Sequence, residues 1–207
     1  MKFNVGKVGA LPTLLPLGES GLLVRFAGTL SDAANRAAIG FARELRRDGL
    51  PPGVTEIHPN LVSVLLKYDP RTTDFDRLAG EVRLRLSQTP TELDGAGEMH
   101  AIRVRFGGPE GPDLEAAADA LHLEPDAFVR AHNASPLRVL ATGFAPGFIY
   151  CGFHPDHLRL PRRPAVRRTV PPGSVLFAAG QTAVTSTPIP TGWYVIGRTD
   201  FRNFDSQ

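Results

Sequence analysis

The sequence predicts an α+β protein made of two domains, and three observations support this fold class. Residues 21–88 carry strand and helix patterns in the order strand, helix, strand, strand, helix. Residues 88–98 combine proline, two glycines and three acids without a large aromatic residue, which is typical of a linker. From Leu137 onward, short apolar runs alternate with turns rich in glycine and proline. We therefore expect a ferredoxin-like domain over residues 1–90 and a β-barrel or β-sandwich domain over residues 98–207.

The first domain opens with an apolar stretch that is interrupted by proline, and a strand follows over residues 21–27. The next segment predicts a helix between Ser31, a suitable N-cap, and Gly49, which follows the last turn. The apolar residues of this segment recur at helical spacing and lie along one face: Ala34, Ala38, Phe41 and Leu45.

Two strands are expected next, over residues 54–58 and 61–68, joined by a Pro-Asn turn. A second helix is expected over residues 73–88, with apolar residues again at helical spacing on one side. This order of elements is most of a split β-α-β arrangement, and it is the reason for the ferredoxin-like assignment.

The second domain is expected to begin with a strand over residues 100–106, followed by a loop and two short helices. Asp113 is placed to cap the first helix, and Pro125 stands in the first turn of the second. The remaining apolar runs predict strands within residues 137–142, 148–153, 174–179, 182–186 and 193–198.

Positive charge is concentrated in one segment of the second domain. The chain has a net charge of +2, yet residues 157–199 contain six arginines and no acid or lysine, so the rest of the chain carries −4. Local charge of this kind favours a small anionic ligand or partner over a nucleic acid, which requires a broader basic surface.

Prolines surround most of these arginines and limit the backbone freedom of the segment. The segment therefore predicts rigidly held guanidinium groups that line a recess and bind a carboxylate or phosphate at two points. The alternative is a solvated loop whose arginines pair with acids of the other domain. The residues concerned are Arg162, Arg163, Arg167 and Arg168.

Two further motifs supply apolar and amide groups for the same recess. In "GFAPGF", Gly147 lets a ligand approach the main chain, and Phe144 and Phe148 offer aromatic surface. Trp193 is the sole tryptophan, and Gln181 suits an amide substrate. Each feature also has a purely structural interpretation: a stiff loop, a core tryptophan or a turn-capping glutamine.

His132 ends a helical stretch and is our candidate for acid–base chemistry, the alternative being a histidine that interacts with the helix dipole. Cys151 lies in an apolar run and is expected to be an inert buried thiol. His154 and His157 have one nearby acid between them, so we expect no metal site.

Several function classes lack their sequence signatures. There is no phosphate-binding P-loop pattern and no G-x-S-x-G nucleophile elbow. No apolar run approaches the length of a membrane span, and Pro12 and Pro16 interrupt the segment where a signal peptide would lie. We therefore expect a cytoplasmic protein with no membrane partner.

Six ordered motifs give the chain a specific resemblance: "GGPEGPDL", "FVRAHN", "GFAPGFIY", "PRR…R…VPPGSV", "AGQT" and "GWYVIGRT". Together they resemble the KipI/PxpB family of 5-oxoprolinase subunits, also called allophanate hydrolase subunit 1 or carboxyltransferase subdomain C/D. The segment "LGESGLLVRF" near the start resembles the family's opening strand, so the resemblance spans nearly the whole chain.

The resemblance implies that the second domain is a cyclophilin-like β-barrel. It also implies a subunit that is not active alone, in an ATP-dependent hydrolase that opens a cyclic amide such as 5-oxoproline. ATP would be shared with partner chains of the KipA/PxpC type and the LamB/YcsF type. The alternative is a non-catalytic, KipI-like inhibitor of a sporulation-type histidine kinase, whose arginines and Phe148 form a protein interface.

On the hydrolase hypothesis, each matching residue receives a role. Arg162, Arg167 and Arg198 would hold a carboxylate or phosphate. Gln181 and the backbone near Gly147 would bind the lactam or a developing oxyanion. His132 would carry the proton, and the aromatic residues Phe144, Phe148 and Trp193 would form the apolar wall.

Overall fold

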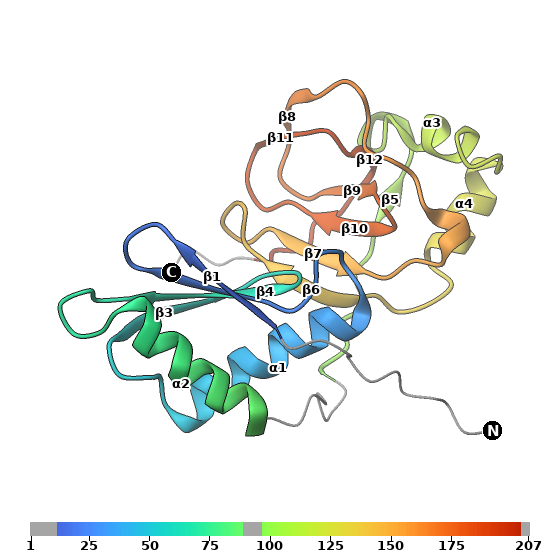
Figure 1. The fold of residues 1–207 in the computed structure, drawn as a ribbon. Helices are drawn as coiled ribbons and strands as arrows, with labels where there is room; N and C mark the ends of the chain where they lie inside the picture. Colours follow the sequence, from blue (N-terminus) through green and yellow to red (C-terminus); the bar gives the residue numbers. More distant parts are fainter. Residues whose placement is uncertain (1–11, 89–96, 204–207) are drawn as a thin grey trace, which may run out of the picture. The chain divides into compact units, whose positions relative to one another are not determined.

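The computed structural model describes residues 12–88 and 97–203, so most of the predicted linker lies outside the described residues. The chain divides into two compact units, residues 1–97 and residues 98–207. Both units combine helices with antiparallel sheets (Figure 1). We describe each unit by itself.

The first unit is a four-stranded antiparallel sheet with the strand order β1-β2-β4-β3. Its two helices cover one face of this sheet (Figure 1). In chain order the elements are β1 (Thr13–Leu17), β2 (Gly21–Arg25), α1 (Asp32–Asp48), β3 (Val54–Pro59), β4 (Ser63–Tyr68) and α2 (Phe75–Gln88).

Helix α1 begins and ends where its sequence signals predict. The Ser31 hydroxyl accepts a hydrogen bond from the Ala34 amide at 3.2 Å, and Gly49 takes a positive φ just after the last turn. Phe41 and Leu45 are buried against the sheet. The predicted capping and the predicted apolar face are both confirmed.

Strand β1 was not among the predicted strands, because Pro16 interrupts the apolar run that forms it. The strand lies at the edge of the sheet, where Pro16 pairs with Leu22. An edge strand needs only one row of ladder hydrogen bonds, so it tolerates a proline that a central strand would not.

The second unit is built on a six-stranded sheet with the order β5-β12-β9-β10-β7-β6, and a two-stranded sheet, β11-β8, accompanies it. Its strands are β5 (Arg105–Phe106), β6 (Arg138–Thr142), β7 (Ile149–Gly152), β8 (Arg167–Val170), β9 (Ser174–Ala178), β10 (Gln181–Val184), β11 (Ile189–Thr191) and β12 (Tyr194–Arg198). Its helices are α3 (Leu114–Asp119) and α4 (Pro125–His132), with short 3-10 turns at Gly108–Glu110 and Asp156–Leu158.

The central strand β9 is buried on both faces, which explains its continuous apolar run. Phe177 packs into one hydrophobic cluster together with Phe128 of α4. Its neighbour Leu176 points the other way and packs with Phe148 and Trp193. The sheet therefore separates two cores, and each core supports a different group of polar residues.

Three local predictions need correction. Of the strand expected over residues 100–106, only Arg105–Phe106 pairs, with β12. The arginine segment is not wholly a loop, because Arg167–Val170 forms β8 and pairs with β11. Asp113 does precede α3, but its side chain makes no capping hydrogen bond. Pro125 occupies the first turn of α4 as predicted. Within the described residues, no helix has both the length and the apolar character needed to cross a membrane.

Candidate functional site

Four aromatic rings form a continuous chain on one face of the large sheet, and we call this group the aromatic surface. Ring centroids lie 5.5 Å apart from Phe144 to Phe148, 4.7 Å from Phe148 to Tyr150, and 6.0 Å from Tyr150 to Trp193. Three of these residues were predicted site residues, and the structure brings them together. Tyr150 was missed because it lies inside a predicted strand.

The rings differ in how firmly they are held. Phe148 and Trp193 are buried in the core beneath the sheet, whereas Phe144 is 70% exposed. Phe144 also has a φ of +76°, a conformation that strains any residue with a side chain. A strained backbone that presents an exposed ring to solvent is typical of a binding site rather than of a core.

The loop that carries Phe144 is anchored through Gly147, which itself has a φ of +65°. Its carbonyl oxygen accepts a hydrogen bond from the Ser186 hydroxyl at 2.7 Å. The Asn203 amide donates to the same carbonyl. The Gly147 carbonyl is therefore engaged within the protein.

Arg162 lies against the aromatic surface. The central carbon of its guanidinium is 5.9 Å from the Trp193 ring centroid. Burial raises the pKa of Tyr150, and the positive charge of Arg162 opposes this shift, so the guanidinium acts on Tyr150 as well. No carboxylate of the described residues forms an ion pair with Arg162. An exposed cation–π contact contributes only about 0.5–1 kcal/mol, so the guanidinium remains available to an anion.

Arg163 and Arg167 behave differently, and here the prediction of acid-free arginines is wrong. Both donate to the buried carboxylate of Asp113, at 3.2 Å from Arg163 Nη1 and 2.5 Å from Arg167 Nη2. The backbone amide of Val195 donates to the same carboxylate at 2.9 Å. We call this group the Asp113 clamp.

The clamp fixes the charge of its members. Hydrogen bonding to Asp113 raises the pKa of Arg167 above its ordinary value. Asp113 is only 5% exposed, and its oxygens are fully used by the two arginines and the amide. Arg167 is therefore held by the protein itself and is not the free ligand-binding group that the sequence predicted.

His132 belongs to a second buried polar group, the His–Thr–His network. The Thr182 hydroxyl lies 2.8 Å from His132 Nε2 and 2.8 Å from His154 Nε2. His132 Nδ1 lies 2.8 Å from the Asn133 side-chain oxygen. If His132 Nδ1 donates to Asn133, then Thr182 donates to His132 and accepts from His154, so all three contacts are satisfied with neutral rings.

Burial lowers the pKa of both histidines, and that of His154 falls to about 3 with a further contribution from His132. The network packs against Phe177, on the face opposite the aromatic surface. The structure therefore does not bring His132 to the predicted recess. It forms a neutral structural network with His154, a residue to which the sequence interpretation gave no role.

The two remaining predicted residues also stand apart. Gln181 is 7% exposed, and its Oε1 atom has no hydrogen-bond partner among the described residues. Arg198 ends β12, five residues beyond Trp193, so the strand separates them by roughly 16 Å at about 3.3 Å per residue. The described residues contain no cluster of three or more His, Cys, Asp or Glu that could hold a metal ion.

Comparison with known proteins points in one direction. The model of the family described as carboxyltransferase domain, subdomain C and D, matches residues 12–207. The chain is 31% identical over 197 residues to a 5-oxoprolinase subunit of Haemophilus influenzae, covering 93% of this chain and 88% of that protein. It is 29% identical over 201 residues to the 5-oxoprolinase subunit of the same name from Bacillus subtilis, covering 92% and 83%.

Two solved structures show the same fold. The crystal structure of TTHA0988 superposes with a TM-score of 0.73 and 35% identity over 86% of this chain, and the chain spans only 35% of that longer protein. The Kluyveromyces lactis urea amidolyase gives a TM-score of 0.71 at 13% identity, covering 94% of this chain and 13% of that one. The second likeness concerns the fold alone.

Proposed function

Because the chain belongs to the carboxyltransferase family, subdomains C and D, we propose that it is one subunit of a 5-oxoprolinase-type amide hydrolase. Two relatives that match most of this chain are named as subunits of 5-oxoprolinase. A subunit acts together with other chains, so we propose that this chain is not active alone.

One observation carries the assignment: an uncommitted guanidinium lies beside a partly exposed aromatic surface. The substrate 5-oxoproline is a flat five-membered lactam that bears one carboxylate. Its ring suits the faces of Phe144 and Trp193, and its carboxylate suits Arg162. A charged hydrogen bond of this kind contributes about 1.5–3 kcal/mol, which is enough to orient a small ligand.

The remaining roles are divided between this chain and its partners. We propose that ATP binds to partner chains of the KipA/PxpC and LamB/YcsF types, since this sequence has no P-loop pattern. We do not assign a proton carrier to this chain, because both ring nitrogens of His132 are engaged within the His–Thr–His network. The complex is proposed to be cytoplasmic.

Finer fold assignments also belong to the proposal. We propose that the first unit is a ferredoxin-like domain in which β1, placed before β2, supplies the fourth strand. We propose that the second unit is a cyclophilin-like barrel, in which the β11-β8 pair covers the core opposite α4.

The experiment is reconstitution of the complex from this chain and its partner chains. ATP hydrolysis that depends on 5-oxoproline is expected from the full mixture and from no mixture that lacks this chain. The proposal fails if the partners hydrolyse ATP equally well without the chain, or if 5-oxoproline never stimulates hydrolysis.

A protein interface is the second candidate, and exposure of apolar side chains favours it. Phe144 is 70% exposed and Val166 is 67% exposed, both beside the arginine segment. On this hypothesis the chain inhibits a histidine kinase without turnover. Loss of kinase autophosphorylation on adding the chain, with no 5-oxoproline dependence in the reconstituted mixture, would select this candidate over the hydrolase subunit.

A further inference from the structure

A polar cavity of about 420 Å³ lies in the second unit, at the far end of β12 from Trp193. Its volume exceeds the share of a single water, about 30 Å³, by more than tenfold, and it falls in the range of small-molecule sites. Its wall combines the turn before β9, the end of β10 and the segment after β12: Pro172, Gly173, Thr185, Ser186, Arg198, Thr199, Asp200, Phe201, Arg202 and Asn203.

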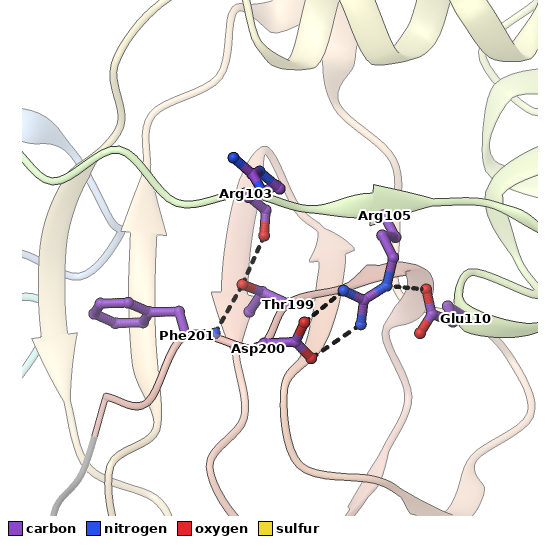
Figure 2. A network of polar contacts seen from close by, with 6 residues as sticks. All are labelled: Arg103, Arg105, Glu110, Thr199, Asp200 and Phe201. Atoms are coloured by element: carbon purple, nitrogen blue, oxygen red, sulfur yellow. Dashed lines mark hydrogen bonds and ion pairs between the residues drawn. The ribbon is translucent and has the colours of Figure 1, made fainter.

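The threonine hydroxyls of the wall are committed to the protein. Thr185 Oγ1 accepts from the Ser174 amide at 3.0 Å and donates to the Pro171 carbonyl at 3.0 Å. Thr199 Oγ1 donates to the Arg103 carbonyl at 2.7 Å and accepts from the Phe201 amide at 3.1 Å (Figure 2). These contacts make the wall rigid but leave the two hydroxyls without a hydrogen to offer a ligand.

The one acid in the wall is neutralised from outside the cavity. Both oxygens of Asp200 accept from Arg105, at 2.6 and 3.0 Å, and Arg105 also donates to Glu110 (Figure 2). These bonds to Arg105 are the main reason that the pKa of Asp200 lies below its ordinary value. Asp200 therefore remains ionised and bound to Arg105, and its negative charge is not free to pair with other cations.

Two arginines of the wall keep their charge without an acid partner. The Nε atom of Arg198 is buried and has no acceptor among the described residues. Arg202 forms no ion pair with the described residues and lies exposed at the rim. An arginine side chain stays protonated, and a buried charged donor without an acceptor is costly. A water molecule would accept the hydrogen bond but would leave both positive charges facing the same space without a counter-charge.

We propose that this cavity is a second ligand site, which binds a small oxyanion through the Nε and terminal nitrogens of Arg198, with Arg202 closing the rim. The chemical class is a phosphate or a carboxylate, since either presents two oxygens to one guanidinium. The proposal is separate from the aromatic surface and does not require the proposed hydrolase function.

The test is an NMR titration of the full chain labelled with ¹⁵N, which follows the arginine Nε–H signals. Inorganic phosphate is added in one series and sodium acetate in another, at constant ionic strength set with chloride. We expect the Arg198 signal to shift with saturation in at least one series. Saturation with phosphate alone assigns a phosphoryl ligand, and saturation with acetate alone or with both assigns a ligand bearing a carboxylate or either group.

Variants locate the site. Arg198→Gln should abolish saturation, and Arg202→Gln, at an exposed position where unfolding is not expected, should weaken the apparent affinity several-fold. The matched control is Arg162→Gln, which removes an equally acid-free guanidinium at the other end of the strand and should leave the titration unchanged. Linear, non-saturating shifts in both series would overturn the proposal, and so would binding that Arg202→Gln leaves intact and Arg162→Gln removes.

Discussion

Two guanidinium environments lie within six residues of each other in the arginine segment. Arg167 is held in the Asp113 clamp, where a buried carboxylate and two arginines satisfy one another. Arg162 lies on the aromatic surface, where it contacts Trp193 and no acid of the described residues. The two side chains are chemically identical, so the difference comes entirely from what the fold places opposite each of them.

The contrast separates residues that hold the fold from residues that face a ligand. A buried carboxylate that loses its partners, or arginines that lose their carboxylate, destabilise the folded state strongly. An exposed guanidinium beside an aromatic ring contributes little to stability and keeps its hydrogen-bond donors free. Substitutions should therefore divide into two classes, and four variants or conditions test that division in order of decreasing effect on the free energy of unfolding.

Asp113→Asn should have the largest effect. The change removes the charge that both arginines share, so we expect the free energy of unfolding of the second unit to fall by about 2–4 kcal/mol. Urea denaturation measures this loss. The control, Asp119→Asn on an exposed position of the same helix, should change stability by less than about 0.5 kcal/mol. Equal losses in the two variants would show that Asp113 is not a clamp.

Thr182→Val comes next, because it removes the one hydroxyl that both buried histidines use. Two imidazole nitrogens would be left without a partner, at an expected cost of about 2 kcal/mol in the free energy of unfolding. The matched control is Thr169→Val on an exposed position of β8. If both variants unfold at the same urea concentration as the unmodified chain, the network has no structural role.

Acidification should weaken the second unit through the same network. Burial keeps the pKa of His132 and His154 below the ordinary value of 6.5, so the unfolded chain binds more protons than the folded chain below that pH. Stability is full above about pH 6.5 and is lost as the pH falls toward 3, at up to ~1.4 kcal/mol per pH unit for each histidine. Urea midpoints at pH 7 and pH 5 measure the loss. His154→Gln should reduce the slope, whereas exposed His157→Gln should not.

Phe144→Gly is expected to act in the opposite direction. Glycine accepts the φ of +76° without strain, so the loop should gain about 0.5–1 kcal/mol in stability, partly offset by the entropy of the unfolded chain. Ligand binding should weaken at the same time, because an exposed ring is removed from the aromatic surface. A variant that is both less stable and equally good at binding would contradict the view that the strain serves the site.

Local sequence signals predicted the elements that depend on local chemistry. Ser31 and Gly49 bound helix α1 as expected, and the run around Phe177 forms a strand buried on both faces. Strand β1 was missed because a proline usually excludes a strand, and only its edge position, a tertiary feature, permits it.

The candidate site shows the same limit. The sequence correctly grouped Phe144, Phe148 and Trp193 with Arg162, because glycine, proline and aromatic residues mark exposed rigid loops. It failed for Arg167, whose partner Asp113 lies 54 residues earlier in the chain. Asp113 stands at the start of a helix, where an acid is usually a cap, and nothing local to the sequence distinguishes a cap from an ion-pair acceptor. Only the tertiary fold brings the two residues together.

The most direct test of the account is the effect of Arg162→Gln on ligand binding. Trp193 is the sole tryptophan and lies beside Arg162, so its fluorescence reports on the aromatic surface. We predict a saturable fluorescence change on titrating 5-oxoproline, with an apparent Kd raised at least about tenfold in Arg162→Gln and unchanged in the control Arg168→Gln, while both variants keep the unmodified urea midpoint. An apparent Kd that Arg162→Gln leaves unchanged, or a stability loss as large as that of Asp113→Asn, would contradict the division between the two guanidinium environments.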